Sequence, residues 1–340
     1  MRRLINIRKK HYRQSRICIR EKLSLAKLRD LLRKLGLINE GLNKVMKSSR
    51  KKFTPWLYNL PAFILIGLIV LFPILYTGYI SFTNMNLYHW QDYTFVGADN
   101  YVRALGKLNS DFFAALWTTI GWTVANMVLD VGIAYILAVG LNAEGLRARR
   151  IYKTLIIFPW AMPAYVSILA WRVGMYNTEF GLLNKVLVAL GFEKMDFLSK
   201  NVPAFLSCMV LNLWMSLPYM IVMFDGALQS VDHSMYESAI LDGAGAWQRN
   251  LYITIPSLRK VMAPVVIMTT FTTFKQFDIV YLLTMQKGSV SGSTMQTIIT
   301  YAHQNAFVSN NYGLSSAVSI VIFVIIIIFS AWTNRAAKET

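Results

Sequence analysis

Hydrogen-bonding side chains gather at one place in the apolar part of the sequence. Between positions 269 and 278, hydroxyl, amide and charged groups alternate with Phe271, Phe274 and Phe277. The polar members of this set are Thr269, Thr270, Thr272, Thr273, Lys275, Gln276 and Asp278. Polar groups in an otherwise apolar helix are costly and often serve a function. A helix here would have two unlike faces, and one of them could line an aqueous cavity.

Two other interpretations of this set remain open. Thr and Ser hydroxyls can bond to carbonyls of their own helix or of a neighbouring helix and so hold a bundle together. Lys275 and Asp278 stand three residues apart, where opposite charges can neutralise each other on one helical face. Aromatic rings beside hydroxyl groups suit a sugar, but they suit a peptide or an amino acid as well.

The sequence contains no pattern of catalytic or metal-ligating residues. It has no Gly-x-Ser-x-Gly turn, no zinc signature and no phosphate-binding G-x-x-x-x-G-K-[ST] loop. The histidines are scattered and the two cysteines lie far apart, at His11, His89, His233, His303, Cys18 and Cys208. We therefore expect no enzyme, no metal site and no bound cofactor. If ATP drives this protein, another polypeptide binds the nucleotide.

Composition and charge distribution indicate a membrane protein. Of the 340 residues, 55% are hydrophobic and only 15% are charged. The formal charge of +18 is concentrated in residues 1–52, which carry 18 basic and 3 acidic groups. A basic region at one end of a hydrophobic chain favours contact with anionic lipid at the cytoplasmic face over nucleic-acid binding. Residues 28–35 could form an amphipathic helix there, or the region could be a solvated extension.

Six apolar stretches are long enough to cross a bilayer. They lie at about 56–82, 112–141, 151–175, 202–228, 261–284 and 312–333. Pro159 and Pro163 should kink the third. We predict an all-α integral membrane protein with about six transmembrane helices and three regions: a basic cytoplasmic extension (1–54), a transmembrane domain (55–335) and a short cytoplasmic tail (336–340). Lys and Arg in the short loops place both termini in the cytoplasm, and the loops at 84–111 and 176–201 outside.

The stretch 236–256, YESAILDGAGAWQRNLYITIP, interrupts the apolar sequence on the predicted cytoplasmic side. It resembles the EAA loop of binding-protein-dependent ABC importer permeases, E-A-A-x3-G-x9-I-x-L-P, with Ser238 and Ile255 as departures. Blocks such as NLWMSLPYMIVMFDGALQSV and YGLSSAVSIVIF also resemble the sugar-importer branch, on the pattern of the larger maltose/maltodextrin permease subunit. The resemblance covers roughly residues 55–335 and implies a type I importer permease bundle. Residues 285–288 depart from it.

The resemblance implies a coupling loop at about 230–260. Residues 237–241 would form a short helix, Gly243 would permit a sharp turn, and residues 247–255 would form a second helix closed by Pro256. This loop would dock in a cleft of a separate ATPase subunit, and its matching residues are Glu237, Ser238, Ala239, Gly243, Ile253, Ile255 and Pro256. An amphipathic helix on the inner membrane surface is the alternative, but it does not require glycine and proline at these offsets.

The resemblance also implies a sugar site halfway across the bilayer. Its matching positions are Met215, Ser216, Tyr219, Thr269, Thr272, Thr273 and Gln276. The implied partners are a second homologous permease, two ATP-binding cassette ATPases, an extracytoplasmic solute-binding protein and a sugar such as maltose or a maltodextrin. The implied location is the bacterial inner membrane. An ion-gradient-driven transporter without an ATPase, using Asp130 and Asp225 as its ion groups, is the alternative function.

Overall fold

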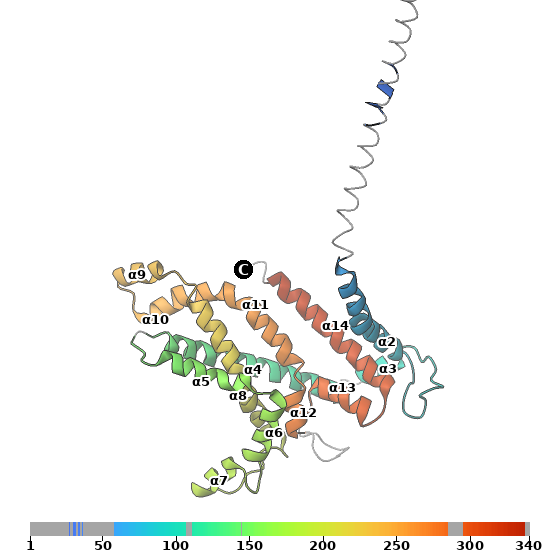
Figure 1. Cartoon of the computed structure of the whole chain (residues 1–340). Coiled ribbons are helices and arrows are strands. Elements are labelled where there is room, and N and C mark those ends of the chain that lie inside the picture. Colours follow the sequence, from blue (N-terminus) through green and yellow to red (C-terminus); the bar gives the residue numbers. More distant parts are fainter. Residues whose placement is uncertain are drawn as a thin grey trace, which may run out of the picture. The chain divides into compact units, whose positions relative to one another are not determined.

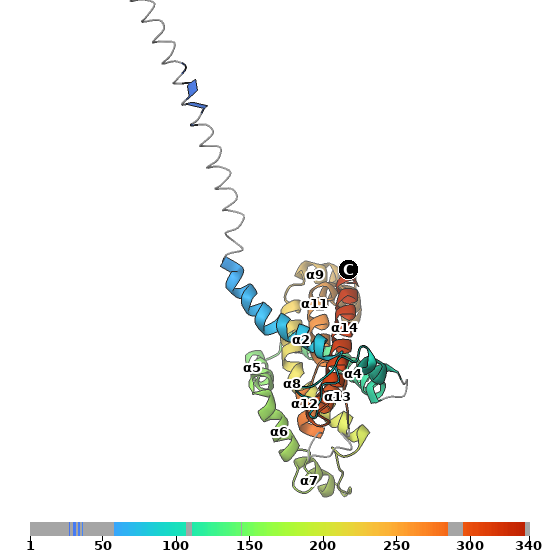
Figure 2. The same ribbon diagram turned by 90° about the vertical axis from the view of Figure 1, so that its right-hand side faces the viewer.

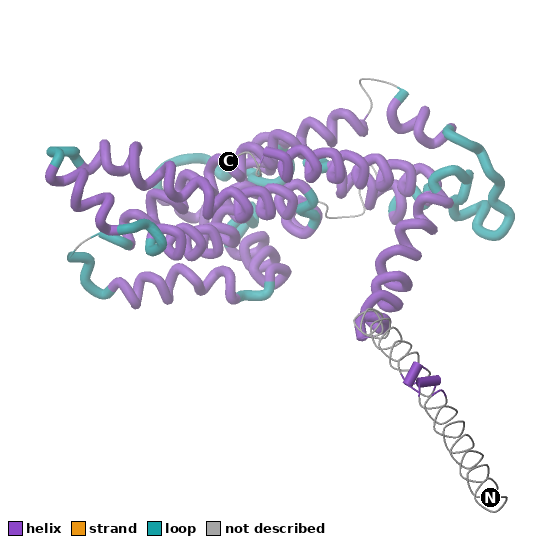
Figure 3. Tube along the Cα trace, turned by 90° about the horizontal axis from the view of Figure 1, so that it is seen from above, coloured by secondary structure: helices purple, strands orange, loops and turns teal. Residues whose placement is uncertain are grey.

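The computed structural model describes residues 58–106, 111–143, 145–284 and 295–336, and isolated positions between 27 and 36. The predicted basic extension, its amphipathic helix and the departure at 285–288 lie almost entirely outside the described residues. The chain forms two units, residues 1–74 and residues 75–340. The described parts consist of helices joined by loops (Figure 3), and their one β-bridge pairs Thr83 with Phe95.

Four of the six predicted transmembrane stretches are present with nearly the predicted bounds. Five helical segments are long and apolar enough to cross a membrane: Tyr58–Ile80, Asp111–Leu141 (α4), Asn201–Leu228 (α8), Ala246–Thr284 and Tyr312–Thr333. The last lies within α14, Tyr312–Ala336. In the first unit, the described residues 58–74 are helical, with a π-helical turn at Gly67–Leu71, and their apolar side chains are exposed. Such a surface matches a hydrocarbon environment.

The third predicted stretch is broken rather than kinked. It consists of α5 (Arg149–Ala161) and α6 (Ala164–Gly174), which meet at 91°. Met162, just before Pro163, has an extended backbone with ψ of 142°. A residue that precedes proline is sterically pushed out of the α region, and this ends α5. Counting the pair as one span gives the six that the sequence predicts.

The fifth stretch is longer than predicted and has an internal break. Its helices are α10 (Ala246–Arg249), a π-helical segment η2 (Asn250–Thr254), α11 (Ile255–Phe274) and α12 (Asp278–Thr284). The regular helix is interrupted at 275–277. The interruption falls within the polar set, so Gln276 lies outside helical structure.

Short helices occupy the loops that join the long ones. They are α3 (Asp99–Leu105), α7 (Leu182–Ala189), α9 (His233–Leu241) and α13 (Ile298–Phe307), whereas α2 (Phe72–Ile80) is the last part of the first span. Two views place α9 and the end of α14 at one end of the second unit and α7 at the other (Figures 1 and 2). The predicted cytoplasmic loop with α9 and the predicted outer loop with α7 therefore lie at opposite ends of the bundle.

Helices α4 and α8 pack together at the centre of the second unit. Ala134 and Ala138 of α4 are fully buried, in one core cluster with Met220 and Phe224 of α8. Small residues let two helices approach closely in a membrane, where packing rather than hydrophobicity drives association. A second cluster adds α6 and α12 to these two helices, and a third joins α3, α13 and α14 to the start of α4.

Candidate functional site

The polar segment between α8 and α11 begins with a capped helix and a tight turn. The Asp232 carboxylate accepts a hydrogen bond from the backbone N–H of Ser234 at 2.9 Å, which caps α9 and lowers the pKa of Asp232. Gly243 has φ of +77°, a conformation that strains residues with a Cβ atom. The backbone N–H of Ala244 closes the turn on the Ala239 carbonyl at 2.9 Å. The predicted short helix and turn are both present.

The predicted end of the second helix at Pro256 is wrong. The chain continues from α10 through η2 directly into α11, and Pro256 is in the first turn of α11. Proline has no N–H, and its ring clashes with the carbonyl four residues earlier in a regular helix. The wider π-helical turn immediately before Ile255 provides the needed departure from regular geometry. The loop is therefore continuous with a transmembrane helix.

Two hydrogen bonds between side chains fasten this segment. The hydroxyls of Tyr236 in α9 and Thr254 in η2 lie 2.9 Å apart, which joins the two arms of the loop. The Tyr135 hydroxyl of α4 donates to Asn250 Oδ1 of η2, which joins the loop to the bundle. Ile253 and Tyr236 also pack against the core cluster around Phe224. The loop is thus fixed to α4 and α8.

The tip of the loop exposes large apolar side chains. Leu241 is 88% exposed, Trp247 75% and Tyr252 74%, and Glu237 and Ser238 beside them are exposed as well. Large apolar side chains that a folded loop leaves in water suggest a contact surface for another protein or a membrane. Sequence reasoning matched this loop by its glycine and proline but missed these three side chains.

On α8, the three predicted sugar-site positions have different surroundings. The Ser216 hydroxyl lies within hydrogen-bonding distance of two acceptors, Asp130 Oδ1 at 2.6 Å and the Asn212 carbonyl at 2.8 Å. The Tyr219 ring packs against Trp160 of α5 with 6.0 Å between centroids. Met215 packs on the second core cluster. All three side chains are half-buried.

The other predicted sugar-site residues lie in the last turns of α11 and in the break that follows it. Thr269 and Thr272 donate to the carbonyls four residues earlier, at 2.9 and 3.1 Å. Hydroxyls that bond to carbonyls of their own helix are what the alternative interpretation of this polar set predicts. Each hydroxyl oxygen can still accept a hydrogen bond from a ligand. Thr273 is buried, and Gln276 is half-buried in the break before α12. In the described residues, no hydrogen bond joins this set to the one on α8.

An apolar groove of about 500 Å³ runs between α4, α8 and α11. Its lining includes Tyr135, Phe224, Met262 and Val266. Val266 and Thr269 are three positions apart and Thr269 and Thr273 four, so all three lie on one face of α11. The groove therefore lies on the same face of α11 as Thr269 and Thr273.

The charged groups in the spans are not arranged as the sequence suggested. The described part of the chain has no ion pair between Lys275 and Asp278, both of which are exposed. They lie on either side of the helix break, so the spacing rule for one helix does not apply. Asp225 is paired with Lys153 and Arg149, whereas Asp130 is fully buried and has an unpartnered Oδ2 atom. The described residues contain no cluster that could hold a metal ion.

Helices long and apolar enough to cross a membrane, joined by a folded loop with exposed apolar side chains, are typical of a membrane protein that binds a partner. Residues 130–339 match the family described as "Binding-protein-dependent transport system inner membrane component", and the chain belongs to this family. This is a family of transport permeases rather than of catalysts, and its members are inner-membrane proteins.

Relatives and a solved structure agree with this assignment. The chain is 29% identical to the galactooligosaccharides transport system permease GanP of Bacillus subtilis, over 94% of this chain and 78% of the relative. It is 30% identical to the trehalose/maltose transport system permease MalF of Thermococcus litoralis, over 81% and 90%. A chain of a bacterial ABC transporter involved in alginate import has the same fold, with a TM-score of 0.74 and 18% identity over 87% of this chain and 99% of that chain.

Proposed function

We propose that the chain is the membrane-spanning permease subunit of an ATP-driven, solute-binding-protein-dependent sugar importer. One observation carries the proposal: a chain of this permease family has a two-helix loop that is hydrogen-bonded to the bundle, is continuous with a transmembrane helix and exposes Leu241, Trp247 and Tyr252. The relatives are named as permeases for galactooligosaccharides, for trehalose and maltose, and for maltodextrin, which favours an oligosaccharide of this kind as the substrate.

The proposed assembly contains a second homologous permease, two ATP-binding cassette ATPases and an extracytoplasmic solute-binding protein. The ATPases bind the nucleotide, and this chain carries no cofactor. Its loop docks on one ATPase, and closure of the two ATPases moves the loop and the attached helices as a rigid body. The residues assigned to this coupling role are Glu237, Ser238, Ala239, Gly243, Ile253, Ile255 and Pro256.

The proposed path for the sugar follows α8, α11 and the helix break at 275–277. Its contacts are Met215, Ser216, Tyr219, Thr269, Thr272, Thr273 and Gln276. The aromatic ring of Tyr219 offers an apolar face for a pyranose ring, and the hydroxyls and the amide offer hydrogen bonds. The apolar groove beside Val266 continues this face toward the loop and suits sugar release, since its lining offers few hydrogen bonds that would hold the sugar.

The proposed location is the bacterial cytoplasmic membrane with both termini in the cytoplasm. The loop and the end of α14 lie at the same end of the second unit, as this orientation requires (Figure 1). The basic residues 1–54 then form a cytoplasmic extension that can contact anionic lipid.

The test compares two glycines that share one backbone conformation. Gly243 in the loop and Gly191 at the opposite end have φ of +77° and +85°, and a Cβ atom at either would meet open space. Both Gly243→Asp and Gly191→Asp therefore introduce similar local strain. We expect ATP-dependent uptake of labelled maltodextrin and galactooligosaccharide to be lost only with Gly243→Asp, at equal amounts of protein in the membrane. Equal uptake by the two variants would contradict the coupling role.

A further inference from the structure

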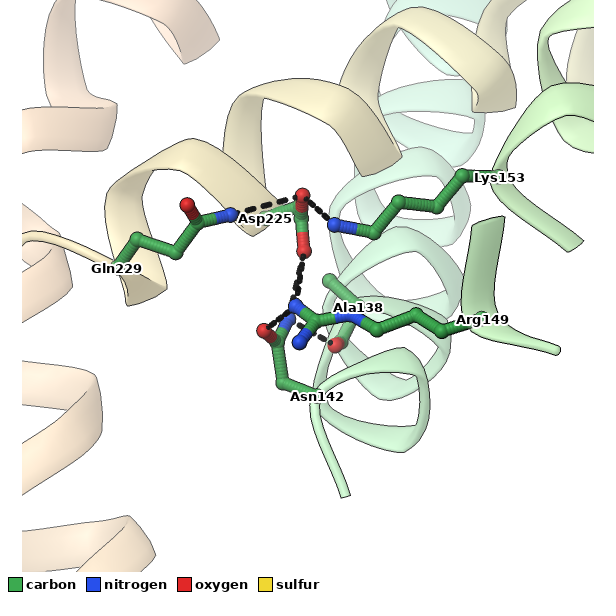
Figure 4. Close-up of polar contacts among 6 residues, drawn as sticks. All are labelled: Ala138, Asn142, Arg149, Lys153, Asp225 and Gln229. Carbon is green, nitrogen blue, oxygen red and sulfur yellow. Dashed lines mark hydrogen bonds and ion pairs between the residues drawn. The ribbon is translucent and has the colours of Figure 1, made fainter. Parts of the chain in front are cut away.

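The carboxylate of Asp225 joins three helices near the end that bears the loop (Figure 4). On α8 itself, Gln229 Nε2 donates to Oδ2 at 3.1 Å. Asn142, directly after α4, donates from Nδ2 to Oδ1 at 2.7 Å. From α5, Lys153 Nζ contacts Oδ2, and an Nη2 atom of Arg149 lies 3.3 Å from Oδ1. Arg149 also donates to Asn142 Oδ1, so the three arms are linked to one another.

The Asp225 carboxylate has more partners and less exposure than a solvated ion pair on a protein surface. The Asp225 side chain is 14% exposed, Lys153 31% and Arg149 39%. Both carboxylate oxygens carry at least two partners. A charge inside an apolar helix is costly unless it is paired and hydrogen-bonded, so these contacts hold the helices in one arrangement. They also occupy the oxygens that an ion-carrying role would need.

The position of Asp225 connects it to the loop. It lies one helical turn before the end of α8 at Leu228, and α9 begins at His233. α5 packs on α8, and Arg149 and Lys153 of α5 form ion pairs with Asp225 of α8. At its other end, α5 is separated from α6 by the 91° break at Met162. α5 is therefore fastened near the loop at one end and joined to α6 through a sharp bend at the other.

We propose that Asp225 is a positioning residue for coupling, which makes α5 follow α8 when an ATPase displaces the loop. This inference rests on the proposed function, because it assigns the route by which motion of the loop reaches the transmembrane helices. The contacts of Asp225 turn α4, α5 and the end of α8 into one rigid unit. Without them, α8 and the loop move while α5 lags, and ATP hydrolysis no longer drives transport efficiently.

The test measures labelled maltodextrin transported per ATP hydrolysed. The complex that copurifies with the tagged full chain is reconstituted in lipid vesicles with its solute-binding protein. Asp225→Asn removes the charge and keeps the shape, and we expect the sugar-to-ATP ratio to fall about tenfold, a typical allosteric coupling factor. Asp225→Glu keeps the charge and should restore most of the ratio. Asp99→Asn is the matched control, because it removes the carboxylate of an exposed ion pair with Arg103 in α3.

A purely structural role gives a different result. In that case Asp225→Asn lowers the amount of complex, but each complex that remains keeps the wild-type ratio, and this outcome overturns the inference. Lys153→Gln tests the same link if Asp225→Asn does not accumulate; a lower ratio supports the inference, and an unchanged ratio overturns it. A wild-type complex without ATP-dependent uptake would instead contradict the proposed function, and the inference with it.

Discussion

The Ser216 hydroxyl lies 2.6 Å from Oδ1 of the buried Asp130 carboxyl group, across the α4–α8 interface. Its other partner, the Asn212 carbonyl at 2.8 Å, is also an acceptor. A serine hydroxyl has one proton, and both partners compete for it. Toward the proposed sugar path, Ser216 can therefore only accept a hydrogen bond. Asp130 is one of the two acceptors that engage the Ser216 proton, and its side chain is fully buried.

Substituting Asp130 should reveal this dependence. An asparagine at this position can donate a hydrogen bond from its amide group to the Ser216 oxygen. That hydrogen bond occupies a lone pair of Ser216 that would otherwise accept one from the sugar. We expect Asp130→Asn and Ser216→Ala each to raise the KM for maltodextrin about tenfold, as expected when one hydrogen bond to the ligand is lost. Because both act on one contact, the double variant should show no further rise. Additive effects in the double variant would refute the shared contact.

The Tyr236–Thr254 hydrogen bond should be needed to keep the coupling loop rigid. Tyr236→Phe removes the hydroxyl that joins α9 to η2, which costs about 1 kcal/mol. We expect the ATP-dependent uptake rate to fall severalfold while the amount of membrane protein stays the same. Tyr165→Phe is the control, because Tyr165 lies in α6, outside the loop, and is 61% exposed. An equal effect of the two substitutions would argue against the loop anchor.

The exposed tip of the loop should carry the contact with the ATPase. Trp247→Ala and Leu241→Asp remove apolar surface that water now covers, so they should leave the fold intact and weaken association by about 2 kcal/mol or more. The measurement is the amount of ATPase that copurifies with the tagged chain. Trp117→Ala, at a Trp of α4 that is 68% exposed, is the control. Undiminished copurification of ATPase with both loop variants would rule out this surface.

Gly313 allows the start of α14 to approach the chain after α2. A Cβ atom there would lie 2.2 Å from the Thr83 carbonyl oxygen and 3.0 Å from Asn100 Nδ2, which bonds the Ser81 and Thr83 carbonyls. Gly313→Ala should therefore lower the Tm of the detergent-solubilised protein by about 5 °C or more. Gly226→Ala, in an open position of α8, should leave Tm unchanged or raise it. Equal Tm values for the two variants would exclude this close approach.

The transmembrane helices could be predicted because a long, apolar stretch of sequence is enough to identify a membrane-spanning helix. Span ends were correct to a few residues at α4 and α8, where the apolar run ends sharply. The start of the fifth span was less predictable, since a π-helical turn lets the helix begin at Ala246 in the loop rather than at 261 and pass through Pro256. Helix α13 went unnoticed because ten residues of mixed polarity give neither a span nor a turn signal.

The site was less predictable than the fold because its contacts join distant parts of the chain. The motif identified the loop, yet the Tyr135–Asn250 bond links residues 115 positions apart. Asp225 was visible only as a charge in an apolar stretch, and its partners on α5 depend on how α5 packs against α8. For Lys275 and Asp278, the sequence suggested a contact that these two described residues do not make. The spacing rule applies to residues of one helix, and here the helix is broken between them.

Reconstitution tests the central claim most directly. The complex that copurifies with the tagged chain is placed in sealed vesicles, and labelled maltodextrin uptake is measured with ATP on the cytoplasmic side, with and without the solute-binding protein. The account predicts uptake only when ATP and the binding protein are both present, and none from a proton or sodium gradient alone. Gradient-driven uptake by this chain without ATP would contradict it.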